Sequence, residues 1–145
     1  MKANEIQIGD WLQHANGKYY QVTRIDRLCD GNIHFACGFP NLWEYNNKFE
    51  PIQLEKIHLV KNGFEVRYGT DDMEFFYNDG YEVKVMFDDG CVIYEQDGKT
   101  IFTKIPPSIF LVIEFAEKSL QMPIEYVHEL QQAMRIMGCD KEIEL

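Results

Sequence analysis

Short runs of alternating apolar and polar residues fill most of this chain, and turn-forming pairs separate the runs. Val83, Val85 and Phe87 alternate with Lys84 and Met86, which gives one apolar and one mostly polar face. The turn-forming pairs are Asn16-Gly17, Asp30-Gly31, Asn62-Gly63, Asp79-Gly80, Asp89-Gly90 and Asp97-Gly98. Short strands between regularly spaced turns are typical of an antiparallel meander. The pattern predicts an α+β fold that is predominantly β.

The first part of the chain, residues 1–53, is expected to form a small SH3-like or KOW-like barrel. Strands are predicted over 6–14, 18–27, 32–36 and 42–46. Asn16-Gly17 predicts a type I′ hairpin between the first two strands, because both central residues of that turn need a positive φ. In the second strand Tyr20 and Val22 share a face and Ile25 does not. A bulge near Thr23 would return Ile25 to the core side.

Residues 54–145 are expected to form a second unit, an antiparallel sheet with a C-terminal helix. A short helix is predicted within 54–61, ending at Asn62-Gly63. Segments 73–77, 91–96 and 99–105 are predicted to continue the meander on either side of the alternating strand. Segment 109–116 fits two structures. Its β-branched and aromatic residues favour a strand, which we prefer, whereas the polar residues of this region fit a helical face.

The last predicted element is a helix over about 124–137. Val127, Leu130, Met134 and Met137 recur at spacings of three and four, which places them in one apolar stripe. Gly138 is well placed to end the helix. We expect the stripe to cover one face of the sheet.

Charge is distributed unevenly along the 145 residues, whose formal net charge is −10. Residues 1–50 contain five Lys or Arg and six Asp or Glu, whereas residues 51–145 contain nine and eighteen. A nucleic-acid binder needs cations that replace the counterions of phosphate. Contact with nucleic acid is therefore possible through the N-terminal barrel only. The acidity of the remainder favours solubility, with a basic partner or an imitation of a phosphate backbone as the alternatives.

No catalytic or metal-binding constellation is recognisable. Ser108 and Ser119 are the only serines, and neither stands in a Gly-x-Ser-x-Gly motif. His128-Glu129-Leu130-Gln131-Gln132 approaches the zinc motif His-Glu-x-x-His, but Gln132 replaces the second histidine, and an amide is a poor zinc ligand. We expect no catalytic residue, no metal and no cofactor, and hence a protein that is not an enzyme.

A cytoplasmic location is predicted. The N-terminus has no apolar leader segment, and the longest apolar run, 109–113, is too short to span a membrane. No membrane partner is expected. The four cysteines are then read as free thiols.

Exposed aromatic residues are the candidate binding site. Alternation places Trp11 and Tyr19 on the face opposite to Leu12 and Tyr20. Tryptophan and tyrosine at exposed positions are frequent contact residues. The alternative is that these rings cover the barrel ends or pack against the second unit. The predicted binding residues are Trp11, Tyr19, Trp43 and Tyr45.

Several segments together resemble a family. They are Ile8–Leu12, Gly17–Val22, Leu42–Tyr45, Lys61–Glu65 and Tyr126–Gln131. This combination is similar to a group of uncharacterised small proteins of gut anaerobic bacteria and of their phages or mobile elements. The resemblance implies a cytoplasmic accessory protein of phage or mobile-element type. It carries over no catalytic residue.

These observations favour a non-enzymatic interaction or accessory protein with an unknown protein partner. Two alternatives remain open. One is a nucleic-acid-binding or regulatory module that uses the N-terminal barrel, and the other is an acidic inhibitor that imitates nucleic acid.

Overall fold

The structure is a computed structural model of the chain. It describes residues 5–38, 42–70, 73–78, 83–88, 91–104, 107–115, 117–139 and 141–145. Within these ranges, residues 67–70, 73–78, 91–95, 101–104 and 115 are described through their backbone alone.

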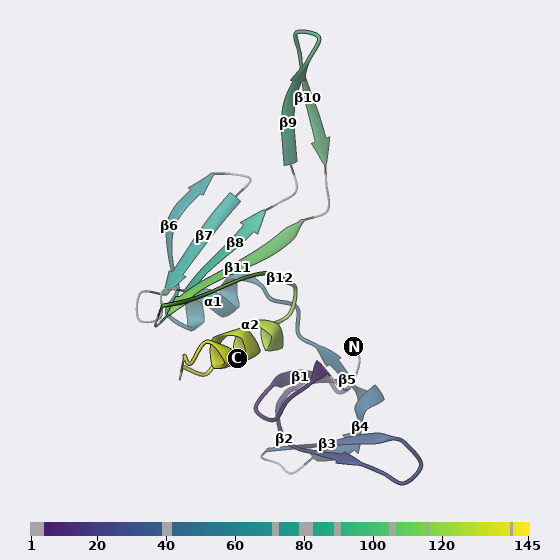
Figure 1. Ribbon diagram of the computed structural model, residues 1–145. Coiled ribbons are helices and arrows are strands. Elements are labelled where there is room, and N and C mark those ends of the chain that lie inside the picture. The colour runs from purple at the N-terminus through teal and green to yellow at the C-terminus, as the bar shows by residue number, and fades with distance from the viewer. Residues whose placement is uncertain are drawn as a thin grey trace.

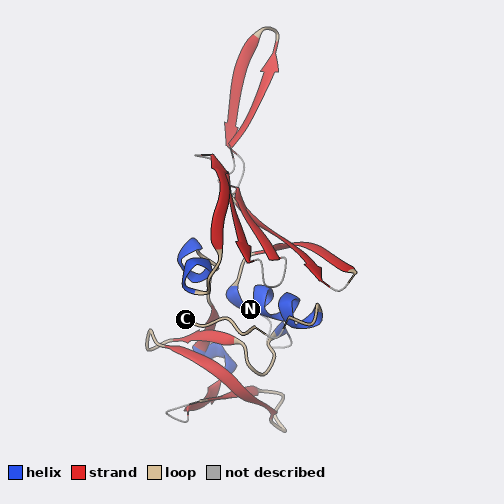
Figure 2. Cartoon of the chain, turned by 90° about the vertical axis from the view of Figure 1, so that its left-hand side faces the viewer, coloured by secondary structure: helices blue, strands red, loops and turns tan. Residues whose placement is uncertain are grey.

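The described chain is predominantly β, with two α-helices, which confirms the predicted α+β class. The strands are β1 (Trp11–His14), β2 (Tyr19–Arg27), β3 (Ile33–Cys37), β4 (Leu42–Tyr45), β5 (Phe49–Pro51), β6 (Glu65–Thr70), β7 (Met73–Asn78), β8 (Val83–Asp88), β9 (Cys91–Gln96), β10 (Lys99–Lys104), β11 (Ser108–Phe115) and β12 (Lys118–Ile124). The helices are α1 (Lys56–Lys61) and α2 (Val127–Ile136), and one 3₁₀ turn covers Asn46–Lys48. Both α-helices lie between the two large sheets (Figures 1 and 2).

The N-terminal sheet has the order β4-β3-β2-β1-β5 with antiparallel neighbours. Its inner face carries the buried residues Leu12, Val22, Phe35 and Phe49, which form a core separate from that of the second sheet. The expected barrel is not closed. Among the described strands, β4 pairs with β3 alone and β5 with β1 alone, and the 3₁₀ turn joins these two edges of the sheet. A curved open sheet therefore replaces the predicted barrel.

The hairpin between β1 and β2 is present, but its turn is not type I′. Gly17 has a φ of +82°, whereas Asn16 does not have a positive φ. Gly17 N donates to His14 O at 2.8 Å and His14 N donates to Lys18 O at 2.9 Å, so the loop has the three-residue form in which glycine takes the left-handed position. The predicted bulge is confirmed. The β2–β3 register shifts between Val22 and Arg24.

The central sheet has the order β12-β11-β8-β7-β6. Segment 109–116 belongs to β11 up to Phe115, so the preference for a strand is confirmed. Leu111 and Ile113 of β11 lie beside Val83 and Val85 of β8, and all four side chains are fully buried. Helix α2 covers this face. The predicted stripe is confirmed, because Val127, Leu130, Met134 and Met137 join the same core.

β9 and β10 do not continue the meander. They pair only with each other among the described strands, and β8 pairs with β11 instead. The two strands form a ribbon that projects away from the body (Figures 1 and 2). Its turn is the type I′ turn expected of such pairs, because Asp97 and Gly98 have φ values of +52° and +70°. The predicted turns at Asp79-Gly80 and Asp89-Gly90 lie outside the described residues.

Strand β12 was not among the predicted elements, and it shortens the last helix. Ile124, the predicted first residue of that helix, pairs with Ile109 at the end of β12. Helix α2 therefore begins at Val127. Pro123 is tolerated in β12 because β12 is an edge strand, where one side of the backbone needs no ladder donor.

Candidate functional site

The outer face of the N-terminal sheet carries an aromatic cluster made of Trp43, His34 and Tyr45. The ring centroid of His34 lies 4.1 Å from that of Trp43 and 4.0 Å from that of Tyr45, with edge-to-face geometry in both pairs. His34 is only 4% exposed, whereas Trp43 and Tyr45 are 51% and 43% exposed. The histidine thus supports two aromatic side chains that stand open to solvent.

Neighbouring strands explain this arrangement. Trp43 and Tyr45 are two residues apart on β4 and share its outer face. Register places Tyr45 opposite His34, and His34 opposite Asp26 of β2. The Trp43 indole N–H donates to Asp26 Oδ2 at 3.3 Å, and Arg24 pairs with the same oxygen at 2.8 Å. The cluster is therefore held from three strands.

The structure does not bring all four predicted binding residues together. Tyr19 is 47% exposed on β2, at the end that pairs with β1 rather than with β3. Trp11 lies on β1, which is separated from β4 by β2 and β3 in the sheet. Its ring packs against the core of the second unit, and its indole N–H donates to Ile143 O at 2.8 Å. For Trp11 the structure favours the packing alternative.

A polar junction that sequence reasoning missed links the loop before β1 to helix α2. Asp10 is fully buried. Its carboxylate accepts hydrogen bonds from Gln132 Nε2 at 2.6 Å, from Arg135 Nη1 at 2.9 Å and from the backbone N–H of Gln7 at 2.8 Å. Arg135 also pairs with Glu142 at 2.8 Å. The Arg135 pKa is raised, mainly by the hydrogen bond to Glu142 and further by the charges of Glu142 and Asp10. Burial of the guanidinium group opposes this effect.

Gly9 marks this junction in the sequence, although we did not predict it. Its φ of +94° lies in the left-handed region. A Cβ atom at this position would stand 2.5 Å from Arg135 Nη2. The backbone conformation therefore favours glycine before Asp10, and a Cβ atom there would displace the Arg135 guanidinium group.

The residues of the near-zinc motif have other roles. Gln132, which stands where a zinc protein would have its second histidine, binds Asp10. His128 is buried, and burial lowers its pKa. In the described part of the chain, no group of three or more His, Cys, Asp or Glu residues is placed to hold a metal ion.

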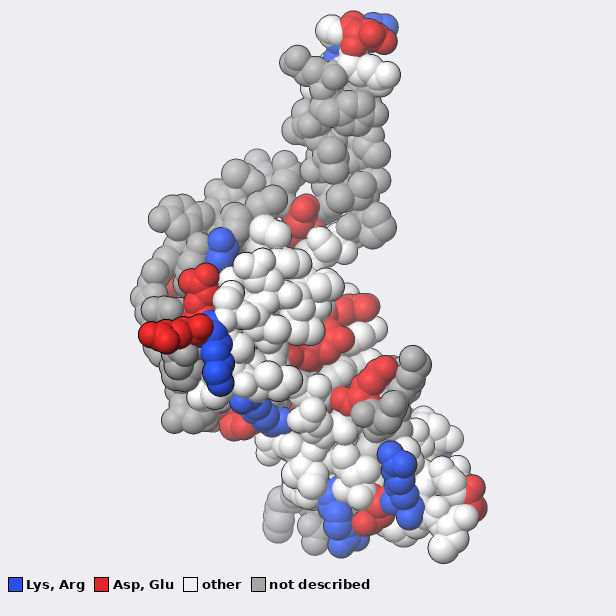
Figure 3. Space-filling view, viewed as in Figure 1, with Lys and Arg blue, Asp and Glu red and all other residues white. Residues whose placement is uncertain are grey.

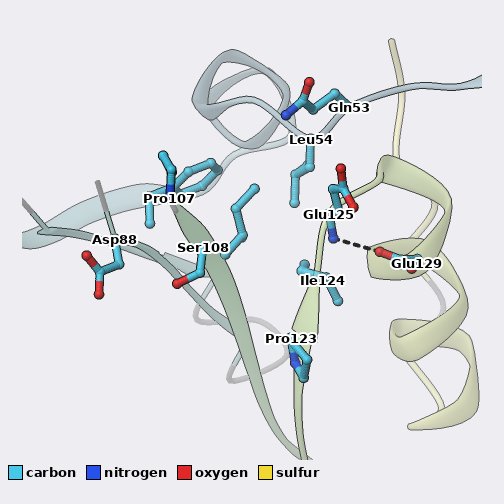
Figure 4. A pocket seen from close by; sticks show the side chains of 11 residues that line it. Gln53, Leu54, Asp88, Pro107, Ser108, Pro123, Ile124, Glu125 and Glu129 are labelled. Atoms are coloured by element: carbon cyan, nitrogen blue, oxygen red, sulfur yellow. Dashed lines mark hydrogen bonds between the residues drawn. The ribbon is translucent and has the colours of Figure 1, made fainter. Parts of the chain in front are cut away.

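A cleft of about 520 Å³ lies where β8 and β11 meet the start of α2 (Figure 4). Its apolar wall includes Leu54, Ile109 and Ile124, and Figure 4 shows Leu54 and Ile124 facing the hollow. The segment that connects the two units lines one side of the cleft with Gln53 and Leu54. It is fixed there because Leu54 N donates to Glu125 O at 2.9 Å and Val127 N donates to Ile52 O at 2.9 Å.

The helix side of the cleft is acidic. Glu129 Oε2 accepts hydrogen bonds from the backbone N–H groups of Glu125 at 2.6 Å and Tyr126 at 3.1 Å, which caps the start of α2. The Glu125 carboxylate accepts a hydrogen bond from the Tyr126 hydroxyl, which raises the pKa of that phenol. Within the described residues, neither Glu125 nor Glu129 forms an ion pair.

Acidic side chains gather along the hollow side of the molecule between the ribbon and the N-terminal sheet (Figure 3). Basic side chains of the N-terminal sheet lie below this acidic side in the same view, with acidic side chains among them (Figure 3). The described helices include none with the length and apolar character that crossing a membrane requires.

Comparison with known protein families, with curated proteins and with solved structures finds no match. The resemblance to small proteins of gut bacteria and their mobile elements therefore stays a prediction.

Proposed function

We propose that this chain is a non-enzymatic interaction protein that binds an extended segment of a partner protein along strand β4. The observation that carries the proposal is the pair of exposed rings, Trp43 and Tyr45, on a strand whose second edge pairs with no described strand. An accessory role of phage or mobile-element type in the cytoplasm is part of the same proposal and depends on the resemblance alone.

The two rings are suited to be contact residues because they are already held in place. His34 packs against both rings, and Asp26 accepts the indole N–H of Trp43. Rigid aromatic side chains supply a large contact area and lose little conformational entropy on binding. Most of the partner's binding energy is expected from these two side chains.

The backbone of β4 supplies the second element of recognition. β4 pairs with β3 on one side, and no described strand pairs with its other side. An exposed sheet edge offers N–H and C=O groups to an added strand, while side chains on alternate positions provide specificity. A partner strand on this edge would lie beside Trp43 and Tyr45.

Nucleic acid is the weaker alternative for the same face. Aromatic side chains on a sheet do stack bases, but they act together with cations that follow the phosphate backbone. Arg24, the cation nearest to Trp43 in the register, is already paired with Asp26. An acidic inhibitor that imitates nucleic acid is supported only by the acidic side of the molecule.

A random peptide library panned against the immobilised full-length protein tests the proposal. Enriched peptides are expected to bind the wild-type protein and to lose roughly tenfold or more in affinity for Trp43→Ala, which removes a central aromatic contact. Tyr19→Ala is the matched control, since Tyr19 is similarly exposed but distant from β4. Enriched peptides that bind both variants equally would contradict the proposal. Salt-sensitive binding of a single-stranded oligothymidylate to this face would favour the nucleic-acid alternative.

A further inference from the structure

We propose that the cleft between β8, β11 and the start of α2 binds an arginine side chain that a partner protein presents beside an apolar residue. The proposal rests on the proposed function only in that the ligand belongs to a partner protein. It concerns a different surface from that of Trp43 and Tyr45.

The shape and apolar wall of the cleft fit a long side chain. The volume of about 520 Å³ lies within the range of sites that enclose small organic groups. Leu54, Ile109 and Ile124 form an apolar wall against which methylene groups are desolvated. Arginine and lysine bury their stems on such surfaces while the charged head stays at a polar rim.

The helix side of the rim has the complementary charge. Glu125 and Glu129 both line the cleft, and neither is in an ion pair within the described residues. Glu129 is oriented by two backbone N–H groups, and the N-terminus of α2 offsets part of its charge. Glu125, which is exposed, keeps more of its charge available. A cationic ligand is therefore expected to depend mainly on Glu125.

The chemistry of the rim favours a guanidinium group over other cations. A planar guanidinium has five donors that match carboxylate oxygens, and it is less strongly hydrated than an ammonium group. A bound metal ion needs more carboxylate or imidazole ligands than this rim contains. The described residues include no group of three His, Cys, Asp or Glu residues placed to hold a metal ion. Arginine next to an apolar residue satisfies both the wall and the rim.

The test is an NMR titration of the isotope-labelled full-length protein with an acetylated and amidated Leu-Arg-Leu peptide. Expected are amide shifts at Leu54, Ile109, Ile124 and Glu125. The same peptide with citrulline in place of arginine, which keeps the shape and removes the charge, is expected to cause no such shifts. Glu125→Gln should weaken binding roughly threefold to tenfold, as the loss of a partly exposed ion pair does.

Glu114→Gln is the matched control. Glu114 is an exposed residue of β11, and its substitution makes the same change in net charge outside the cleft. Equal losses in both glutamate variants would show general attraction to an acidic surface and would overturn the proposal. Equal binding of the citrulline peptide would overturn it as well. Trp43→Ala should leave this titration unchanged, so a failure at the cleft and a failure at β4 are separate results.

Discussion

The Asp10 carboxylate lies 2.9 Å from Arg135 Nη1 and joins the loop before β1 to helix α2. The other oxygen of the carboxylate takes hydrogen bonds from Gln132 and from the backbone of Gln7. One buried acid thereby connects two segments that are more than a hundred residues apart in the chain. Asp10 is therefore one of the joints between the two units, together with the bond from Trp11 to Ile143.

Replacing Asp10 by alanine is expected to destabilise the protein strongly. Gln132 and the Gln7 backbone would lose this acceptor, and Arg135 would lose its buried partner, at a cost of about 2–4 kcal/mol. Urea unfolding followed by circular dichroism measures the change. Glu142→Ala removes the exposed partner of the same arginine and should cost less than about 1 kcal/mol. Equal losses would show that burial of Asp10 is not what matters.

Alanine at Gly9 should be more damaging than alanine at Gly17. Both glycines have positive φ, with values of +94° and +82°. At Gly17 an added Cβ meets nothing within 4 Å, so only the backbone cost of about 1 kcal/mol applies. At Gly9 the Cβ would also push Arg135 away from Asp10. Thermal unfolding of the two variants gives the comparison, and a similar loss in both would argue against the close packing at Gly9.

The C-terminal tail is expected to contribute to stability through Ile143. This residue is almost fully buried in the core of the second unit, so Ile143→Ala should cost about 2–4 kcal/mol. Ile136, which is 71% exposed on α2, is the matched control, and its substitution should change the free energy of unfolding by less than about 0.5 kcal/mol. Denaturant titrations measure both. A small effect at Ile143 would show that the tail is not part of the folded core.

Lowering the pH should destabilise the protein through His128, at pH values where the Asp and Glu carboxylates are still ionised. Burial lowers the pKa of His128 below the ordinary value of 6.5. As the pH falls through 6.5, the unfolded chain takes up a proton that the folded chain does not, so stability decreases in this range. His128→Gln should reduce the slope of unfolding free energy against pH between about pH 7 and pH 5. An unchanged slope of unfolding free energy against pH would show that other groups cause the loss of stability. His58 is one such group, because burial lowers its pKa too.

The cysteines are expected to differ sharply in reactivity. Burial raises the pKa of the Cys37 thiol to about 11, whereas Cys29 is exposed. Because the thiolate is the nucleophile, Ellman's reagent at pH 8 should modify Cys29 rapidly and Cys37 only on unfolding. Measurement in a Cys91→Ser, Cys139→Ser background isolates the two thiols. Rapid modification of both in the folded protein would contradict the burial of Cys37.

Features set by local chemistry could be predicted from the sequence. Alternation identified β8, and the parity change in β2 identified the bulge near Thr23. Helical spacing identified the apolar stripe of α2, and Gly138, with a φ of +84°, ends that helix as expected. Each of these depends on neighbours in the chain, so a short window of residues contains the needed information.

Features set by distant contacts could not be predicted. A turn signal at Asp89-Gly90 says that the chain reverses, but not that β8 then pairs with β11 and leaves β9 and β10 outside the sheet. The alternation of Leu120 and Met122 is a sequence pattern that indicates strand β12, but Pro123 argues against a strand because proline has no backbone N–H to donate. The type of turn at Asn16-Gly17 depends on the register of the flanking strands.

The candidate sites follow the same division. Exposure of Trp43 and Tyr45 agrees with their pattern on one strand, whereas the contact of Trp11 with Ile143 required the tertiary structure. The sequence around Asp10 does not indicate that this residue is buried, because the side chains that bind it, Gln132 and Arg135, come from the other end of the chain. The acidic cleft combines four separate segments and has no local signature.

The bond from Trp11 to Ile143 spans 132 positions along the chain and has a consequence for biosynthesis. A ribosome releases the N-terminal sheet long before it has made α2 and the tail, so Asp10 and Trp11 emerge without the groups that will cover them. The N-terminal sheet can acquire its own core early, since that core draws only on residues up to Phe49. Docking of the two units must wait until Ile143 has been translated, and closing such long loops is slow. We therefore expect the nascent chain to pass through a stage in which one sheet is formed and the joint is still open.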